Sequence, residues 1–204
     1  MSAQITLNAQ NLSRRLGRRE VIRNISLQLR RGEVLGLLGH NGAGKSTTMQ
    51  LLSGVLLPHA GKIEICGIDL AREPLRAKAC IGFLPETPPL YRDMRVDDYL
   101  VYAAKLHRVP RAGIAAALAS AKERCGLNDT GSKIIGTLSK GYQQRVGIAQ
   151  AIIHQPEIVI LDEPTVGLDP AQIREIRALI RELGNAHSVI LSTHLLGEVE
   201  NICD

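Results

Sequence analysis

The sequence predicts an α/β fold with a mostly parallel sheet, an N-terminal antiparallel β subdomain and an inserted helical subdomain. Three observations lead to this fold class. Short apolar runs typical of buried strands alternate with helical segments near both ends of the chain, which favours a parallel sheet. A glycine-rich loop at residues 39–47 separates one such strand from a helix. After Pro88-Pro89, helical segments dominate up to about Leu138, which indicates a helical insertion.

The first part of the chain is expected to form strands and one helix. Apolar and polar residues alternate in the first two strands, which the turn-like Gly17-Arg18-Arg19 joins. The third strand is a short apolar run between Gly32 and Gly39, as expected of a buried strand. A helix follows the glycine-rich loop, and Gly54 fits its C-terminal end. The expected strands are 5–11, 21–29, 33–38, 62–66 and 80–84, and the expected helix is 45–53.

The helical subdomain is expected to contain two helices, the second of them rich in alanine. A further helix opens at Ser139 or Lys140, and the alternation of strand and helix then returns. The expected helices are 96–107, 112–124, 139–153 and 171–183, and the expected strands are 157–161 and 188–192. We expect one domain over residues 1–204, with an α/β core of about 1–86 and 154–204 and a helical subdomain of about 87–153.

Composition favours a globular protein with reduced thiols. Of the 204 residues 45% are apolar, yet the longest apolar runs are too short to span a bilayer, and the first residues lack a signal-peptide pattern. The four cysteines form no C-x-x-C pair, which is typical of a cytosolic protein.

The net charge of +5 raises the question of nucleic-acid binding. Aromatic residues make up only 2% of the chain, so it offers little material for stacking on bases. A solvated basic face, or one near anionic lipid or phosphate, is therefore favoured over direct contact with nucleic acid. Much of the excess lies in Arg14, Arg15, Arg18, Arg19, Arg30 and Arg31.

Residues 39–46 match the pattern G-x-x-x-x-G-K-[ST] between an expected strand and an expected helix. Such a loop suits phosphate because glycines let the backbone N–H groups turn inward, while the helix N-terminus adds partial positive charge. We expect Lys45 to reach the β- and γ-phosphates of ATP, and the Ser46 hydroxyl to ligate Mg²⁺. The pattern predicts a P-loop NTPase with nucleotide contacts from Gly39, His40, Asn41, Gly42, Ala43, Gly44, Lys45, Ser46 and Thr47.

Two carboxylates follow the apolar run at 158–161. A strand buried on both faces presents such residues at its C-terminal edge, where ligands bind in open α/β sheets. Asp162 is expected to hold Mg²⁺, and Glu163 to polarise the attacking water. An apolar strand that ends in Asp-Glu is weak evidence alone, but it gains force downstream of a phosphate loop.

Leu138-Ser139-Lys140-Gly141-Tyr142-Gln143-Gln144-Arg145 resembles the signature motif of ABC transporter ATP-binding subunits. Gly167-Leu168-Asp169-Pro170 is similar to the D-loop of that family, and Ser192-Thr193-His194 to its switch histidine. Residues 81–86 occupy the place of its Q-loop. The resemblance covers essentially the whole chain, with the motifs in the family's order.

The resemblance implies a motor subunit that binds and hydrolyses ATP with Mg²⁺. Two copies, as a homodimer or heterodimer, would close head to tail, with Ser139 and Gly141 contacting the γ-phosphate held by the other subunit. His194 would contact the γ-phosphate and orient the water, so the catalytic residues would be Glu163, His194 and Lys45. The dimer would drive a transmembrane permease, which places it in the cytoplasm, peripherally on the inner face of the membrane, without direct contact with nucleic acid.

Several positions depart from the family pattern. The signature carries Lys140 and Tyr142 where the common form has glycine and glutamine, and the Q-loop position carries Glu86 instead of glutamine. A carboxylate at Glu86 is expected to approach Mg²⁺ through water. These variants, with Pro88-Pro89-Leu90-Tyr91, resemble an exporter-type branch that includes gliding-motility and multidrug-export ATPases.

The base-binding side and the end of the chain also differ. The family stacks adenine on an aromatic residue, a position taken here by Leu16, with Arg15 as the alternative. An apolar face or a guanidinium plane replaces the ring, so we predict modest discrimination between ATP and GTP. Family members continue past the switch histidine with a further strand and helix, and a C-terminal truncation is expected here.

Two other functions remain open at this stage. A soluble ABC-type ATPase that acts on ribosomes or DNA usually has two ATPase halves or a long inserted arm, and neither is seen. A non-hydrolysing nucleotide-sensing module needs neither Glu163 nor His194. The resemblance implies that the choice of transported substrate lies in the permease.

Overall fold

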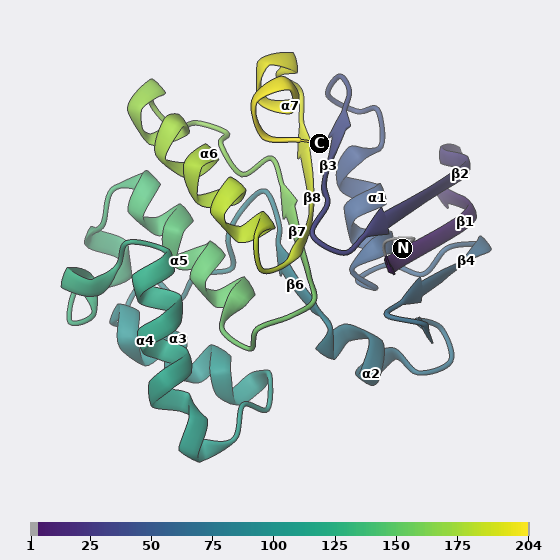
Figure 1. The fold of residues 1–204 in the computed structure, drawn as a ribbon. Helices are drawn as coiled ribbons and strands as arrows, with labels where there is room; N and C mark the ends of the chain where they lie inside the picture. The colour runs from purple at the N-terminus through teal and green to yellow at the C-terminus, as the bar shows by residue number, and fades with distance from the viewer. Residues whose placement is uncertain (1–3, 204) are drawn as a thin grey trace.

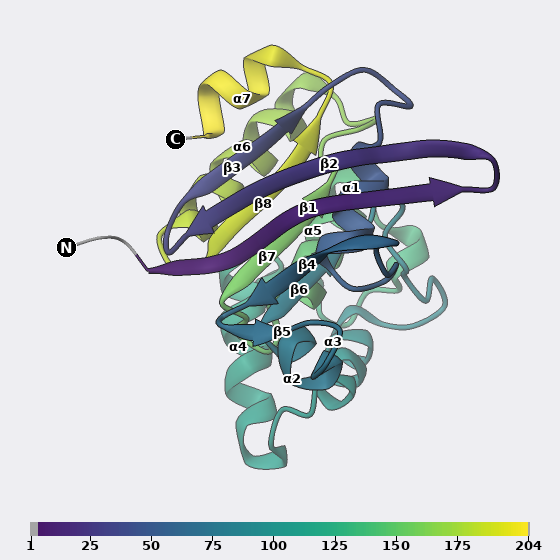
Figure 2. The same cartoon turned by 90° about the vertical axis from the view of Figure 1, so that its right-hand side faces the viewer.

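Two four-stranded sheets with helices between and beside them organise the chain in the computed structural model, which describes residues 4–203 (Figure 1). The start of the chain, where we expected no signal peptide, lies largely outside this range. Helix α1 (Lys45–Leu52) lies between the two sheets, helices α5 and α6 lie on the other face of the second sheet, and α3 and α4 pack on the far side of α5 (Figures 1 and 2). These layers match the predicted α/β fold class.

The first sheet is antiparallel and has the strand order β2-β1-β4-β5. The strands β1 and β2 are longer than predicted because their arginine-rich ends keep pairing up to Leu16 and Arg19, which leaves only Gly17-Arg18 as the turn. Leu7 in the central strand pairs with Leu29 and Ile65 on either side, and all three are buried against α1 and the second sheet. The strands are β1 (Ile5–Leu16), β2 (Arg19–Arg30), β4 (Ala60–Ile65) and β5 (Ile68–Asp69).

The second sheet is entirely parallel and has the order β3-β8-β7-β6. Its core strand β7 is buried along its full length, with Val159 and Leu161 on the side of the helices and Ile158 and Ile160 facing the first sheet. Because parallel strands end at one edge, the residues that follow them are brought together there. The strands are β3 (Val34–Leu38), β6 (Ile81–Leu84), β7 (Ile158–Asp162) and β8 (Ser188–Thr193).

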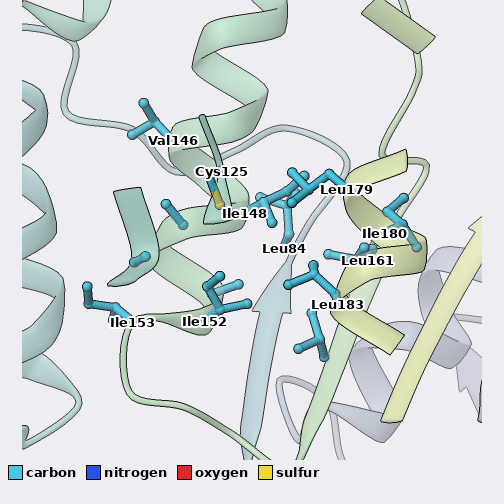
Figure 3. Packing of buried hydrophobic residues seen from close by; sticks show 14 of the residues in the cluster. Leu84, Cys125, Val146, Ile148, Ile152, Ile153, Leu161, Leu179, Ile180 and Leu183 are labelled. Carbon is cyan, nitrogen blue, oxygen red and sulfur yellow. The ribbon is translucent and has the colours of Figure 1, made fainter. Parts of the chain in front are cut away.

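The helices on the outer face of the second sheet pack through apolar residues (Figure 3). Ile148 and Ile152 of α5 meet Leu179 and Leu183 of α6 and Leu161 of β7 in one cluster. Asp169 caps α6 by accepting hydrogen bonds from the N–H groups of the first turn, and proline follows it at the first helical position. The helices are α3 (Val96–Leu106), α4 (Ile114–Arg124), α5 (Lys140–Ile152) and α6 (Pro170–Gly184).

The elements α2 (Pro74–Ala79), β5 and α7 (Leu196–Ile202) were not predicted. Helix α2 buries only Ala77, so it has no apolar periodicity. Strand β5 has two residues and pairs with β4, and α7 is a short helix that packs against Gly36 in β3. Among the described residues, no helix has the length and apolarity needed to cross a bilayer. The division into a core and a helical subdomain near residues 86 and 154 stays a prediction.

Two of the histidines without a predicted catalytic role pack in the fold. His107 and His154 stack with their ring centroids 3.8 Å apart, and a ring nitrogen of His154 lies 3.1 Å from the carbonyl oxygen of Ile81. Burial, reinforced by the neighbouring His107, lowers the pKa of His154 to about 4. His154 is therefore neutral at pH 7 and serves packing.

Gly82 marks the closest approach of strand β6 to helix α5. A Cβ atom at this position would lie 2.0 Å from the carbonyl oxygen of Ala151, which is backbone and cannot rotate away. We expect Gly82→Ala to destabilise the fold by about 3 kcal/mol in chemical denaturation. Gly113→Ala is the matched control because its Cβ would meet only a methyl group of Val109, at 3.8 Å. Equal stability of the two variants would contradict this packing.

Candidate active site

A cavity of about 450 Å³ opens at the carboxyl-terminal edge of the parallel sheet. Its wall joins the loop between β3 and α1, the residues after β7 and β8, the loop after β6 and the start of β2. Segments far apart in the sequence therefore meet around one space. The lining residues are Arg19, Val21, Asn41, Gly42, Gly44, Lys45, Ser46, Thr47, Glu86, Glu163, Val166 and His194.

The glycine-rich loop turns directly into α1 at Gly44. This residue has a φ of 95°, and a Cβ atom there would lie 2.8 Å from a methyl group of Ile22 and 3.1 Å from the carbonyl oxygen of Val21. Only glycine fits this position without strain. The first N–H groups of a helix have no partner within the helix, so the loop presents donors and partial positive charge to the cavity.

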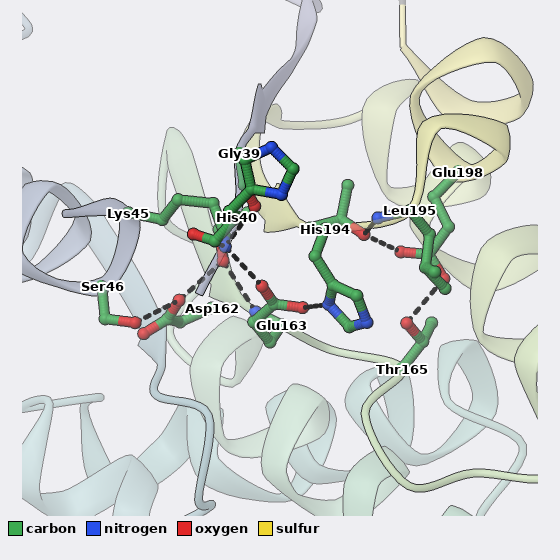
Figure 4. A network of polar contacts seen from close by, with 12 residues as sticks. Gly39, His40, Lys45, Ser46, Asp162, Glu163, Thr165, His194, Leu195 and Glu198 are labelled. Atoms are coloured by element: carbon green, nitrogen blue, oxygen red, sulfur yellow. Dashed lines mark hydrogen bonds and ion pairs between the residues drawn. The ribbon is translucent and has the colours of Figure 1, made fainter. Parts of the chain in front are cut away.

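Lys45 lies at the centre of the polar network in Figure 4. Its ammonium group donates to the carbonyl oxygens of Gly39 and His40, at 2.7 and 3.2 Å. It also lies 3.1 Å from Oε1 of Glu163, and the two side chains are only 9% and 7% exposed. This arrangement keeps one positive charge at the cavity, shared between loop carbonyls and a carboxylate.

Glu163 links Lys45 to His194. Its backbone has a φ of 47° directly after the end of β7, and its Oε2 lies 2.8 Å from Nδ1 of His194. Since an ionised carboxylate only accepts hydrogen bonds, His194 donates from Nδ1. All three residues that the sequence predicts to be catalytic therefore lie in one contact chain.

Asp162 receives two hydroxyl groups at the same oxygen. Ser46 donates to Oδ1 of Asp162 at 3.2 Å, and Ser192 donates to it at 2.6 Å. The Ser192 hydroxyl also accepts from the backbone N–H of Glu163 at 2.9 Å. Ser192 was not among the predicted site residues, although it belongs to the motif quoted for His194. A serine near the end of a fully buried strand is the signal that could have found it.

Replacing Ser192 tests its role in holding the two carboxylates. Ser192→Ala removes a donor from Asp162 and leaves the buried N–H of Glu163 without its acceptor. We expect a loss of about 2 kcal/mol in the free energy of unfolding, measured by urea denaturation. Ser132→Ala, at an exposed serine, should leave it unchanged. A Ser192→Ala protein as stable as the parent would mean that the hydrogen bonds of Ser192 contribute nothing to the free energy of unfolding.

The other predicted site residues lie in different places. Glu86 is exposed at the cavity wall, whereas Leu16 is 45% exposed at the tip of the β1–β2 hairpin and does not line the cavity. Arg19 and Val21 line it from that hairpin instead.

Ser139 is exposed and caps α5 by accepting from the N–H of Tyr142 at 3.4 Å. Ala43, Ser139 and Gly141 lie outside the lining, and so do Gly39 and His40, which contribute carbonyl groups to Lys45.

The donor set at Ser46 and Asp162 fits a magnesium ion. No group of three or more histidine, cysteine, aspartate or glutamate side chains with metal-site geometry occurs within residues 4–203. Mg²⁺ keeps several waters and takes only one or two carboxylates beside the oxygens of a phosphate ligand. One carboxylate and one hydroxyl in mutual contact therefore suffice for it.

The comparison with known families decides the identity of the fold. The family model for ABC transporters matches residues 22–166. The chain belongs to the ABC transporter family. The matched stretch contains the phosphate loop, the signature-like segment and the adjacent carboxylates Asp162 and Glu163.

Individual relatives within the ABC transporter family support the assignment. The linearmycin resistance ATP-binding protein LnrL of Bacillus subtilis is 36% identical over 200 residues, which cover 97% of this chain and 64% of that protein. The bacitracin transport ATP-binding protein BcrA of Bacillus licheniformis is 34% identical, with the same coverage. Among solved structures, CbiO1 of Clostridium perfringens, part of the ABC transporter complex cbiONQ, superposes with a TM-score of 0.87 at 30% identity, covering 98% of this chain and 83% of that one. The chain thus has the P-loop ATPase fold of the family and spans less than two thirds of the length of the first two relatives.

Proposed function

We propose that this chain is the ATP-binding and ATP-hydrolysing motor subunit of an ABC transporter that powers a separate membrane permease for export. The observation that carries the proposal is the contact chain from Lys45 through Glu163 to His194 in the wall of a phosphate-loop cavity. The names of the relatives in linearmycin resistance and bacitracin transport support the direction of transport.

The residues of the cavity suit hydrolysis of a terminal phosphate. Phosphate oxygens would compete with the carbonyls of Gly39 and His40 and with Glu163 for the ammonium group of Lys45, which stabilises the charge of the transferring group. Oε1 of Glu163 is buried and accepts no hydrogen bond from any residue between 4 and 203. Its one close partner among these residues is the ammonium group of Lys45, at 3.1 Å, and when phosphate oxygens draw that group away Oε1 can orient and polarise a water molecule for attack on the γ-phosphorus. His194 holds the other carboxylate oxygen and fixes the direction of that attack.

The magnesium ion belongs to the same proposal. Ser46 and Asp162 would hold it, with Glu86 at the cavity wall as a more distant carboxylate. When bound, the ion neutralises charge on the β- and γ-phosphates. Ser192 keeps the Asp162 carboxylate oriented through its 2.6 Å hydrogen bond.

The site of one chain is proposed to be half of a functional site. Ser139 and Gly141 do not line the cavity of their own chain, and Ser139 is exposed at the N-terminus of α5. A helix N-terminus with an exposed serine is a suitable anion contact. These residues would complete the cavity of a second subunit in a head-to-tail dimer, at the inner face of the membrane.

A second, apolar groove of about 280 Å³ supports the permease as partner. Pro85 and Pro89 border it, while Glu86 between them lines the nucleotide cavity, so one short loop contacts both spaces. Tyr91 and Leu106 are exposed at this groove although they are large and apolar. A cytoplasmic segment of the permease would cover them, and nucleotide binding would reach the permease through the loop.

The proposed function is tested by phosphate release from Mg-ATP, with and without the proposed permease partner reconstituted in lipid vesicles. We expect activity that depends on Mg²⁺ and rises several-fold with the permease, and a Leu106→Asp variant that keeps its basal rate but loses the stimulation. Stimulation by RNA or ribosomes instead would favour the alternative soluble ATPase. ATP binding without turnover under all these conditions would favour a nucleotide sensor.

A further inference from the structure

A buried carboxylate behind the cavity has no part in the chemistry described above. Glu198 of helix α7 is 0% exposed, although α7 is a short helix on the outside of the fold. An ionised carboxylate is costly to bury unless several donors surround it. The contacts of Glu198 therefore explain how its burial is stabilised.

Glu198 accepts a hydrogen bond at each of its two oxygens (Figure 4). The hydroxyl of Thr165 lies 2.6 Å from Oε1, and the hydroxyl of Thr193 lies 2.6 Å from Oε2. The guanidinium group of Arg177 on α6 lies 3.4 Å from Oε1 and balances the charge. The Thr193 hydroxyl in turn accepts from the N–H of Leu195 at 3.0 Å, which fixes the orientation of that hydroxyl group.

The two threonines stand next to the reacting groups. Thr165 follows Glu163 by two residues in the loop after β7, and Thr193 directly precedes His194 at the end of β8. Their side chains reach the same carboxylate, while those of Glu163 and His194 meet each other at 2.8 Å. Two contacts thus join the same pair of loops, one at the cavity and one behind it.

We propose that Glu198 is a positioning residue for hydrolysis, which clamps the loop of Glu163 to the loop of His194. The inference rests on the proposed ATPase function. A carboxylate suits the role because it accepts strong hydrogen bonds from both loops at once, whereas an apolar residue would join neither. Through α7, the clamp also ties the orientation of the catalytic pair to a helix that does not touch the cavity.

The first test separates turnover from binding. Glu198→Ala is expected to lower kcat for ATP by about 100-fold while KM stays within about twofold, because misplaced groups still bind phosphate but no longer align the water. Thr165→Val, which removes one of the two bonds and leaves the carboxylate in place, should lower kcat by about tenfold. Thr165→Ser, which restores the hydroxyl, should recover most of that loss. The matched control is Glu200→Ala, which changes an exposed glutamate of the same helix. We expect this variant to have the same kcat as the parent protein.

The second test needs no activity. The side-chain ¹⁵N signal of Nδ1 of His194, assigned by its absence in His194→Asn, reports the hydrogen bond to Glu163 in the nucleotide-free protein. We expect the signal to move toward that of an unbonded ring in Glu198→Ala and in Thr165→Val, and to stay in Glu200→Ala. Unchanged signals in folded Glu198→Ala and Thr165→Val, or a parallel change in KM and kcat, would overturn the inference. An inactive parent protein with these signal changes would remove the proposed hydrolysis but leave the clamp in place.

Discussion

Glu163→Gln is expected to lower ATP turnover by about 1,000-fold and to leave ATP binding within a few-fold of the parent protein. The amide has the same shape as the carboxylate and still accepts a hydrogen bond from Nδ1 of His194, so the cavity keeps its form. It lacks the negative charge that polarises the attacking water. It also releases Lys45 from its ion pair, which leaves the ammonium group free for phosphate.

Single-turnover release of phosphate and equilibrium binding of ATP measure the two effects separately. Glu123→Gln on α4 is the matched control, since that glutamate is exposed and lies outside the cavity lining. It should behave as the parent in both assays. Turnover by Glu163→Gln at the rate of the parent would exclude Glu163 as the residue that polarises water.

Lys45→Met is expected to weaken the binding of Mg-ATP by about 100-fold and to abolish measurable turnover. The ammonium group is held at the phosphate loop by the carbonyls of Gly39 and His40, and each hydrogen bond that this charged donor gives to a phosphate oxygen is worth about 1.5–3 kcal/mol. Methionine keeps the length of the side chain but supplies no donor. The variant also leaves Glu163 with His194 as its remaining partner, so the carboxylate repels the phosphates.

Isothermal titration with ATP measures this loss. Lys105→Met replaces an exposed lysine on α3 and should retain the affinity of the parent, which separates the contact from a general change in charge. Equal affinities of the Lys45→Met and parent proteins would show that the phosphates bind elsewhere.

The phosphate loop and the two carboxylates can be recognised in the sequence because their signals are local. The loop pattern fixes its own geometry through Gly44, and β7 is apolar on both faces, so both can be recognised without knowledge of their neighbours. The fold class follows from the same alternation of strands and helices. Boundaries were less accurate: the hairpin extends to Leu16 and Arg19 because cross-strand pairing, which periodicity does not report, continues past the apolar residues.

The parts that the sequence did not predict depend on contacts between distant segments. Ser192 bridges Asp162 and Glu163, which lie about 30 residues earlier, and Glu198 meets Thr165 across 33 residues. A serine near the end of a buried strand marks Ser192 as unusual, but no short pattern in the sequence shows which distant residues it or Glu198 contacts. The hairpin gives a similar case: the place of Leu16 in the chain predicts a contact with the base, whereas Arg19 on the neighbouring strand lines the cavity.

Sedimentation velocity of Glu163→Gln with and without Mg-ATP tests most directly that the cavity is an ATP half-site. Hydrolysis is blocked in this variant, so a closed pair should persist. We predict a monomer without nucleotide and a dimer with Mg-ATP that retains one ATP per chain, and a Ser139→Ala substitution should weaken this dimer. A protein that binds ATP fully and remains monomeric at every concentration would contradict the account.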